Sequence, residues 1–104
     1  MTPGRIAFAV MLSGLPFVPA QAETIRVTID KLEFAPAEVK AKVGDTIEWV
    51  NKDALVHTAT ATNNDWAVNI APRQSGSVAL KKPGAVDYFC KFHPNMKGRV
   101  VVAP

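Results

Sequence analysis

Apolar and polar residues alternate with a period of two through most of the chain after residue 22, and this alternation constrains the fold more than any other feature. The stretch TIRVTID, for example, places Ile25, Val27 and Ile29 on one face of an extended strand. Turn residues separate one such stretch from the next. We therefore predict strands at residues 24–30, 39–43, 46–51, 56–62, 66–70, 77–80, 85–90 and 99–103.

Short strands at this spacing predict an all-β fold, either an antiparallel sandwich or a barrel. No stretch sustains a helical period, so any helix would have one or two turns, with residues 65–71 as the candidate segment. The chain has 104 residues, which suits one small domain.

The first 22 residues have the pattern of a secretory signal peptide. Residues 1–5 carry one positive charge, residues 6–18 are mostly apolar, and Ala20-Gln21-Ala22 is an A-x-A cleavage site. The apolar stretch is shorter than the roughly 20 residues that a membrane-spanning helix needs, although a retained N-terminal anchor is the alternative. We expect residues 1–22 to be removed, leaving residues 23–104 as a single periplasmic domain without a membrane span.

Charge and cysteine content narrow the class of function. The formal net charge of +3 is weak and scattered, which argues against a nucleic-acid partner. Export implies an oxidising compartment, in which cysteines normally pair, yet Cys90 is the single cysteine of the sequence. A lone thiol in an exported protein calls for an intermolecular bridge, a reactive role or a metal.

The side chains that could bind a soft metal are concentrated near the C-terminus. After loss of the leader, the remaining His, Cys and Met residues are His57, Cys90, His93 and Met96. The last three follow C-x-x-H-x-x-M spacing in a short turn, and His57 would arrive from a neighbouring strand. Two imidazoles, one thiolate and a distant thioether are the donors of a blue-copper electron-transfer site. A structural zinc site would more often use paired cysteines, which are absent from this sequence.

The segment YFCKFHPNMKGRVVV resembles the ligand loop of the cupredoxins, most closely that of the amicyanin branch. The upstream segment IEWVNKDALVH is similar to the Trp-x-Asn…His segment of the same family. The resemblance implies a Greek-key β-sandwich of about seven to eight strands that binds one Cu(II)/Cu(I) ion. It also implies that His57, Cys90 and His93 are the strong ligands and Met96 the axial one.

Two departures from the family pattern concern the surroundings of the site. Many cupredoxins have, directly after the upstream histidine, an Asn that links the two ligand-bearing loops; this chain has Thr58, with a shorter side chain. Phe92 stands where amicyanins usually have Pro, and Asn95 where an aromatic residue is common. The partner of amicyanins is therefore not assumed to carry over.

The resemblance implies a monomeric carrier of single electrons rather than an enzyme. Its donor and acceptor would be redox proteins, such as a periplasmic dehydrogenase or a c-type cytochrome, that dock transiently around His93. Exposed apolar residues suited to such docking are Ala54, Leu55, Phe92 and Pro94, and four basic residues flank the ligand segments: Lys52, Lys91, Lys97 and Arg99.

Three alternatives remain open at this point. A copper chaperone or store could use the same four ligands. A thiol enzyme could use Cys90 as nucleophile and a histidine as base. Each residue also has a structural interpretation by itself, with Cys90 as a buried apolar residue, His93 as a surface histidine and Met96 as core filling.

Overall fold

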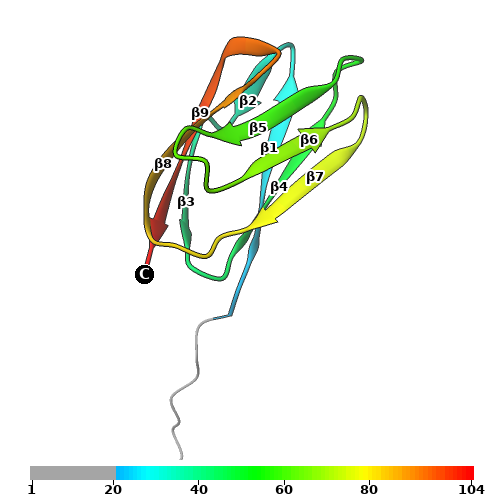
Figure 1. The fold of residues 1–104 in the computed structure, drawn as a ribbon. Coiled ribbons are helices and arrows are strands. Elements are labelled where there is room, and N and C mark those ends of the chain that lie inside the picture. The colour runs from blue at the N-terminus through cyan, green and yellow to red at the C-terminus, as the bar shows by residue number, and fades with distance from the viewer. Residues whose placement is uncertain (1–20) are drawn as a thin grey trace, which may run out of the picture.

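The computed structural model describes residues 21–104, which form two β-sheets packed face to face (Figure 1). The nine strands of this part of the chain are β1 (Thr24–Asp30), β2 (Glu33–Ala35), β3 (Glu38–Lys42), β4 (Thr46–Asn51), β5 (His57–Ala61), β6 (Ala67–Ile70), β7 (Ser75–Ala79), β8 (Gly84–Cys90) and β9 (His93–Ala103). One sheet has the strand order β2-β1-β4-β7, and the other has the order β3-β9-β8-β5-β6. The predicted all-β sandwich is confirmed.

Two strand pairs in the sandwich are parallel, which differs from the wholly antiparallel arrangement that we predicted. Strand β1 runs parallel to β4, and β3 runs parallel to β9. The cause is a crossover, because β3 lies in the five-stranded sheet although β1, β2 and β4 all belong to the other one. Because the chain passes through the other sheet between them, β4 lies beside β1 and runs in the same direction, whereas a hairpin would have made the pair antiparallel.

The eight predicted strands are all present, and the structure adds a ninth, β2, which is only three residues long. The candidate helix at residues 65–71 is wrong, because Ala67–Ile70 is strand β6 and pairs with β5. Within residues 21–104 no helix has the length and apolarity needed to cross a membrane. The predicted leader lies outside the described residues apart from Gln21 and Ala22.

Aromatic side chains fill the centre of the sandwich. Trp49 and Tyr88 are almost fully buried, and Trp49 Nε1 donates a hydrogen bond of 3.2 Å to the Tyr88 hydroxyl. Burial raises the pKa of Tyr88 to about 12. Phe34 and Trp66 pack against Tyr88 with ring centroids 4.8 and 5.6 Å away. These contacts tie both sheets together beneath the end of the molecule that carries the candidate ligands.

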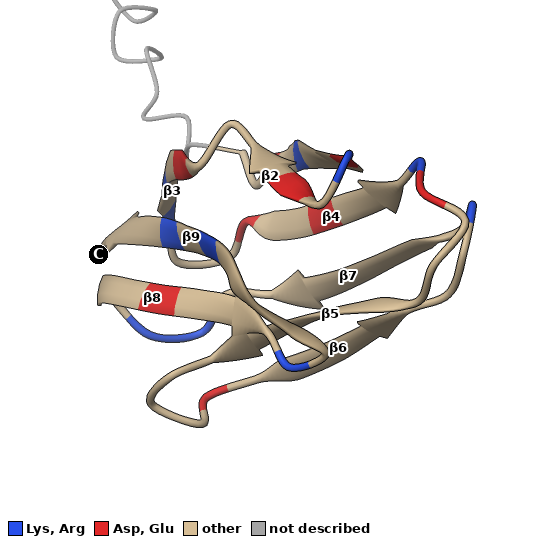
Figure 2. Cartoon of the chain, turned by 90° about the horizontal axis from the view of Figure 1, so that it is seen from above, with Lys and Arg blue, Asp and Glu red and all other residues tan. Residues whose placement is uncertain are grey.

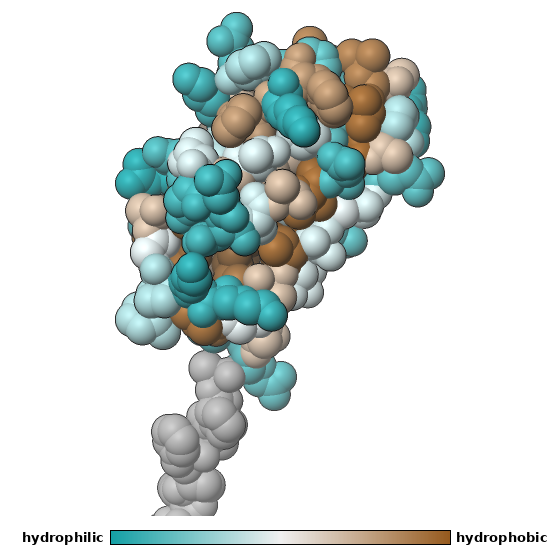
Figure 3. Space-filling model, viewed as in Figure 1, coloured by the Kyte–Doolittle hydropathy of each residue, from teal (hydrophilic) through white to brown (hydrophobic). Residues whose placement is uncertain are grey.

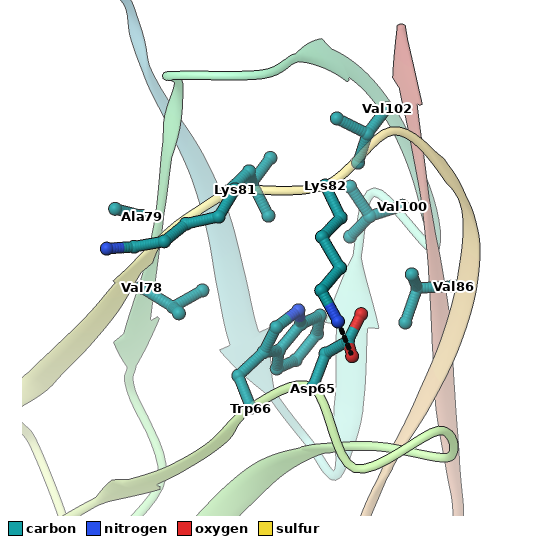
Figure 4. Close-up of a pocket in the computed structure, with 10 residues that line it drawn as sticks. Asp65, Trp66, Val78, Ala79, Lys81, Lys82, Val86, Val100 and Val102 are labelled. Atoms are coloured by element: carbon teal, nitrogen blue, oxygen red, sulfur yellow. Dashed lines mark hydrogen bonds and ion pairs between the residues drawn. The ribbon is translucent and has the colours of Figure 1, made fainter. Parts of the chain in front are cut away.

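A crevice of about 220 Å³ opens between the sheets, lined by Trp66, the β7–β8 connection and the second half of β9 (Figure 4). Lys82 extends across it to Asp65, with Nζ and Oδ1 3.3 Å apart, whereas Lys81 points away. None of the four candidate ligands lines this crevice. Its valine-rich lining is therefore separate from the site described next.

Candidate metal centre

Strand ends at one end of the sandwich bring the candidate ligands together. His57 is the first residue of β5, Cys90 the last of β8, and His93 the first of β9, with Met96 three residues further along. Strands β5 and β8 are neighbours in the five-stranded sheet, as are β8 and β9. Figure 1 shows these strand ends at the top of the molecule, opposite the C-terminus.

The hairpin between β8 and β9 turns more tightly than we expected. Lys91 and Phe92 alone separate the two strands, and Cys90 pairs directly with His93. The next register pair is Phe89 with Lys97, so residues 94–96 form a bulge. The bulge places Met96 among the buried residues of β9, on the same inward side as Val100.

Three of the four predicted ligands converge on one point. Sγ of Cys90 lies 3.7 Å from Nδ1 of His57 and 3.7 Å from Nδ1 of His93. One donor atom from each residue falls within 4.8 Å of the others, and the two imidazole centroids are 5.0 Å apart. Met96 follows His93 by three residues. Its side chain is buried, and it lines the same surface depression as His93.

Cys90 is fully buried, so its thiol cannot meet a substrate from solvent. The backbone N–H of Thr58 donates to Sγ at 3.4 Å, which fixes the position of the sulfur. Asp87 lies on the outward face of β8, opposite Cys90, and therefore cannot orient a base at the thiol. These features argue against the thiol-enzyme alternative.

A carboxylate that we had not predicted fixes the other side of His57. Oδ2 of Asp53 lies 2.9 Å from Nε2 of His57, which leaves Nδ1 facing Cys90. The same carboxylate accepts hydrogen bonds from the backbone N–H groups of Lys31 at 2.8 Å and Leu32 at 3.0 Å. Burial raises the pKa of Asp53, but the hydrogen bonds from His57, Leu32 and Lys31 outweigh it, so the net pKa lies below its ordinary value.

Asp53 also stabilises a turn in an unusual conformation. Lys31 and Leu32, between β1 and β2, have φ angles of 54° and 64°, which favour glycine. Two consecutive N–H groups in this conformation make a concave site for an anion. The carboxylate of Asp53 occupies it and so connects the β1–β2 turn to His57.

Asn51 organises the loop that leads to His57. Its side chain is almost fully buried, and Nδ2 donates to the carbonyl groups of Leu55, Ile70 and Ala71 at 2.8 to 3.3 Å. Its Oδ1 accepts from the backbone N–H of Asp53 at 2.9 Å. Asn51 thus fixes the path of the loop, and the loop in turn positions the Asp53 carboxylate.

Thr58 connects the two ligand-bearing segments despite its short side chain. Its hydroxyl accepts a hydrogen bond of 2.9 Å from the backbone N–H of Lys91, in the β8–β9 turn. The Thr60 hydroxyl is its second partner, at 3.0 Å. Together with the N–H contact to Cys90, Thr58 therefore joins the β5 and β8–β9 segments that carry all four predicted ligands.

His93 is half-buried, unlike His57, and apolar residues surround it. The exposed large apolar side chains at this end of the molecule belong to Leu32, Leu55, Val56 and Phe92. Leu32, Phe92 and Pro94 line one depression with His93. Figure 3 shows apolar side chains gathered at the upper end of the molecule, where the ligand-bearing loops lie in Figure 1. We call Leu32, Leu55, Val56, Phe92 and Pro94 the apolar rim.

Charges do not form a face of one sign. Figure 2 shows acidic and basic positions interspersed along the strands and loops of the described chain. Of the four basic residues noted in the sequence, Lys52 and Lys91 lie in the loops of the ligand end, whereas Lys97 and Arg99 are exposed positions of β9. Arg99 pairs with Asp87, at 3.6 Å between Nη1 and Oδ1.

The donor set fits copper. A buried thiolate and two imidazole nitrogens at mutual distances below 4.8 Å provide soft and intermediate ligands to one ion. Because the chain has one cysteine, the C-x-x-C pairs common in structural zinc sites cannot form. Two of the three donors have a supporting partner: Asp53 contacts the far nitrogen of His57, and the Thr58 N–H contacts the Cys90 sulfur, as is expected around metal ligands.

Sequence reasoning missed Asp53 and Leu32. Asp53 lies only four residues before His57, and this proximity in the sequence could have indicated a contact between the two side chains. Leu32 lies in a turn 25 positions upstream of His57, and only the fold brings that turn to the site.

Comparison with known proteins gives one consistent result. Residues 5–102 match the Cupredoxin-like domain family. The chain is 31% identical over 102 residues to amicyanin of Paracoccus denitrificans, covering 90% of this chain and 78% of that protein. It is 34% identical over 102 residues to methylamine utilization protein MauL of Methylorubrum extorquens, covering 94% and 87%. The crystal structure of amicyanin from Paracoccus versutus superposes with a TM-score of 0.67 at 34% identity, covering 82% of this chain and 84% of that one.

Proposed function

The chain belongs to the cupredoxin-like family, and from that premise we propose that His57, Cys90, His93 and Met96 hold its copper ion and that it carries electrons in the periplasm. It is an electron carrier rather than an enzyme, and it resembles the amicyanins within the family. The observation that supports the ligand assignment best is the convergence of the Cys90 thiol and both imidazoles on one point.

Copper in such a site would alternate between Cu(II) and Cu(I) and so transfer one electron at a time. The residues around it keep the ligand positions constant between the two states. His57 is fixed by Asp53, Cys90 by Thr58, and the β8–β9 turn by the hydrogen bond between Thr58 and Lys91. A rigid set of ligands needs little rearrangement, which favours fast exchange of an electron.

The copper-handling alternative predicts that the ion leaves the protein. Burial of His57 and Cys90 opposes this, because release would require the loops to open. The test is voltammetry of the copper-loaded protein together with a chelator competition for Cu(I). We expect reversible one-electron cycling with copper retained in both states. Rapid loss of Cu(I) to the chelator would favour the chaperone or store.

We propose that residues 1–22 direct export and are then removed, leaving residues 23–104 as a monomeric domain. The charged start, apolar stretch and A-x-A motif of the sequence support this. Its redox partners would be a periplasmic dehydrogenase and a c-type cytochrome, since its relatives include amicyanins and a methylamine utilization protein. Intact mass after expression of the full chain in an exporting bacterium checks the cleavage.

We also propose that partners dock on the apolar rim, where His93 comes nearest to solvent. Electron-transfer encounters use small, weak interfaces, and an apolar patch around the metal end suits one. Phe92→Ala should slow bimolecular electron transfer by roughly threefold or more, because Phe92 is the most exposed large apolar residue in the described part of the chain.

Val43→Ala is the matched control for the docking site. Val43 is also an exposed apolar residue, but it follows β3 at the opposite end of the molecule. Stopped-flow rates with a c-type cytochrome should be unchanged in this variant. Equal slowing by both substitutions would show that the apolar rim is not the docking site.

A further inference from the structure

The first residue after the predicted cleavage site is held by both of its backbone groups. The nitrogen of Glu23 donates to Oδ1 of Asp45 at 2.9 Å, and its carbonyl accepts from the backbone N–H of Thr46 at 2.9 Å. Gln21 and Ala22, which precede it, are exposed and belong to no strand. Within residues 21–104, the backbone contacts to the domain therefore begin at Glu23, one residue before β1.

Asp45 is a buried carboxylate, 2% exposed, in the turn between β3 and β4. It accepts from the Glu23 nitrogen, from the Lys42 backbone N–H at 3.0 Å and from the Lys42 ammonium at 2.9 Å. The hydrogen bond from Glu23 lowers the pKa of Asp45 most, followed by those from Lys42, so the carboxylate is ionised at neutral pH. Two donors share Oδ1: the ammonium of Lys42 and the nitrogen of Glu23.

The nitrogen of Glu23 is a neutral amide as long as Ala22 is attached. Hydrolysis of the Ala22–Glu23 peptide bond by a leader peptidase consumes one water. The C–N bond breaks, the hydroxyl goes to the Ala22 carbonyl carbon, and the nitrogen becomes an α-amine that is protonated near neutral pH. The same atom then carries a positive charge, 2.9 Å from an ionised carboxylate in the present geometry.

We propose that Asp45 is a binding site for the α-ammonium group of Glu23 that removal of the leader creates. The proposal rests on the proposed export and cleavage of the chain, and it adds a role for the N-terminus that cleavage creates. A hydrogen bond between charged groups is about twice as strong as a neutral one, so processing would strengthen an existing contact. Cutting one residue earlier or later would move the charge by up to about 3.5 Å and lose this contact.

The site lies away from the copper ligands. Glu23 and Asp45 sit where β1 and β4 begin, whereas the ligands sit where β4 leads into β5 and where β8 meets β9. The charged side chain in contact with Asp45 is that of Lys42, the last residue of β3. Lys81 follows Leu80, whose backbone N–H donates to the Asp45 carbonyl at 2.8 Å. Processing would therefore stabilise the folded domain without altering the metal site.

Two measurements on the exported protein test the proposal. Intact mass of the protein purified from the periplasm should correspond to a chain that starts at Glu23. An NMR pH titration of the reduced, copper-loaded protein should give the α-amine a pKa above its ordinary range of about 7.7–8.0, because a nearby carboxylate favours the charged form.

Asp45→Asn should return the α-amine pKa to the ordinary range, whereas the control Asp65→Asn, which breaks the ion pair with Lys82, should leave it raised. If Asp45→Asn does not fold, Lys42→Met serves instead, because loss of the competing ammonium should raise the α-amine pKa further. A different N-terminus in the mass spectrum overturns the cleavage position. An α-amine that titrates in the ordinary range of the wild type overturns the role of Asp45.

Discussion

At the scale of single residues, both ring nitrogens of the candidate ligand His57 have a defined neighbour. Asp53 holds Nε2, and this leaves Nδ1 for the metal side of the ring. A carboxylate that accepts from a ligating imidazole increases the electron density of the ligand and stabilises the more highly charged metal. Asp53 should therefore favour Cu(II) over Cu(I).

Asp53→Asn should raise the reduction potential by on the order of tens of millivolts, because it removes a negative charge near the metal but keeps an oxygen acceptor. Voltammetry of the copper-loaded variant measures this shift. Asp87→Asn is the control, since it removes an exposed carboxylate from the outer face of β8. Equal potentials for wild type and Asp53→Asn would show that the carboxylate does not tune the metal.

Thr58→Val should lower the free energy of unfolding by about 1–3 kcal/mol, because the backbone N–H of Lys91 loses its acceptor in a partly buried position. Valine preserves the shape of the side chain, so packing changes little. Thr58→Ser keeps the hydroxyl and should recover most of the loss. Denaturant unfolding monitored by tryptophan fluorescence distinguishes them, and a Thr58→Val protein as stable as wild type would argue that the connection between the loops is energetically neutral.

At the scale of the structural elements, the β8–β9 hairpin depends on one glycine. Gly98 pairs with Tyr88 across the two strands, and the Tyr88 ring lies directly against it. A Cβ built at Gly98 would come within 2.3 Å of Cζ of Tyr88. Only glycine lets this ring pack inside the sandwich, where it contacts Phe34 and Trp49.

Gly98→Ala should therefore destabilise the protein by about 1–3 kcal/mol, since the ring must shift in a fully packed core. Thermal unfolding followed by near-ultraviolet circular dichroism checks both the stability and the ring environment. Ala85→Ser, at an exposed position of the neighbouring strand β8, is the control and should change little. A Gly98→Ala variant of unchanged stability and unchanged spectrum would mean that Tyr88 has room to move.

The strands were predictable because their apolar residues alternate regularly, as in TIRVTID, whose bounds as β1 match the prediction. The start of β9 was not, because Pro94 and the bulge interrupt the alternation between His93 and Lys97. The parallel pairing of β1 with β4 also escaped prediction, since no local pattern reports which sheet β3 joins. The cluster of His57, Cys90 and His93 was predictable from residue type and spacing, whereas the contact of Asp53 depends on the folded turn at Lys31 and Leu32.

At the scale of the whole molecule, the two ends have different roles. One end carries the candidate ligands and the apolar rim. At the other end, Asp45 accepts a hydrogen bond from Glu23, the residue before β1. The sandwich and its aromatic centre separate them. Changes in pH at the Asp45 end should therefore affect stability without affecting the colour of the metal site.

Stability should fall in acid as Asp45 becomes protonated. The pKa of Asp45 is below its ordinary value in the folded state, first because of the Glu23 hydrogen bond and then because of Lys42. Its contribution is thus fully present above the unfolded pKa of about 3.9 and is lost as pH falls through the lower folded value. Urea unfolding from pH 7 down to pH 2 should show Asp45→Asn less stable at neutral pH and the difference shrinking below about pH 4. A constant difference would contradict the lowered pKa.

The visible absorption spectrum shows whether His57, Cys90, His93 and Met96 together form one blue-copper site. We predict that one equivalent of Cu(II) produces an intense thiolate-to-copper charge-transfer band in the wild type. Cys90→Ser should abolish this band, and Met96→Gln should retain it with a shifted reduction potential. A wild-type protein that stays colourless with Cu(II), or that binds zinc in preference to copper, would contradict the account.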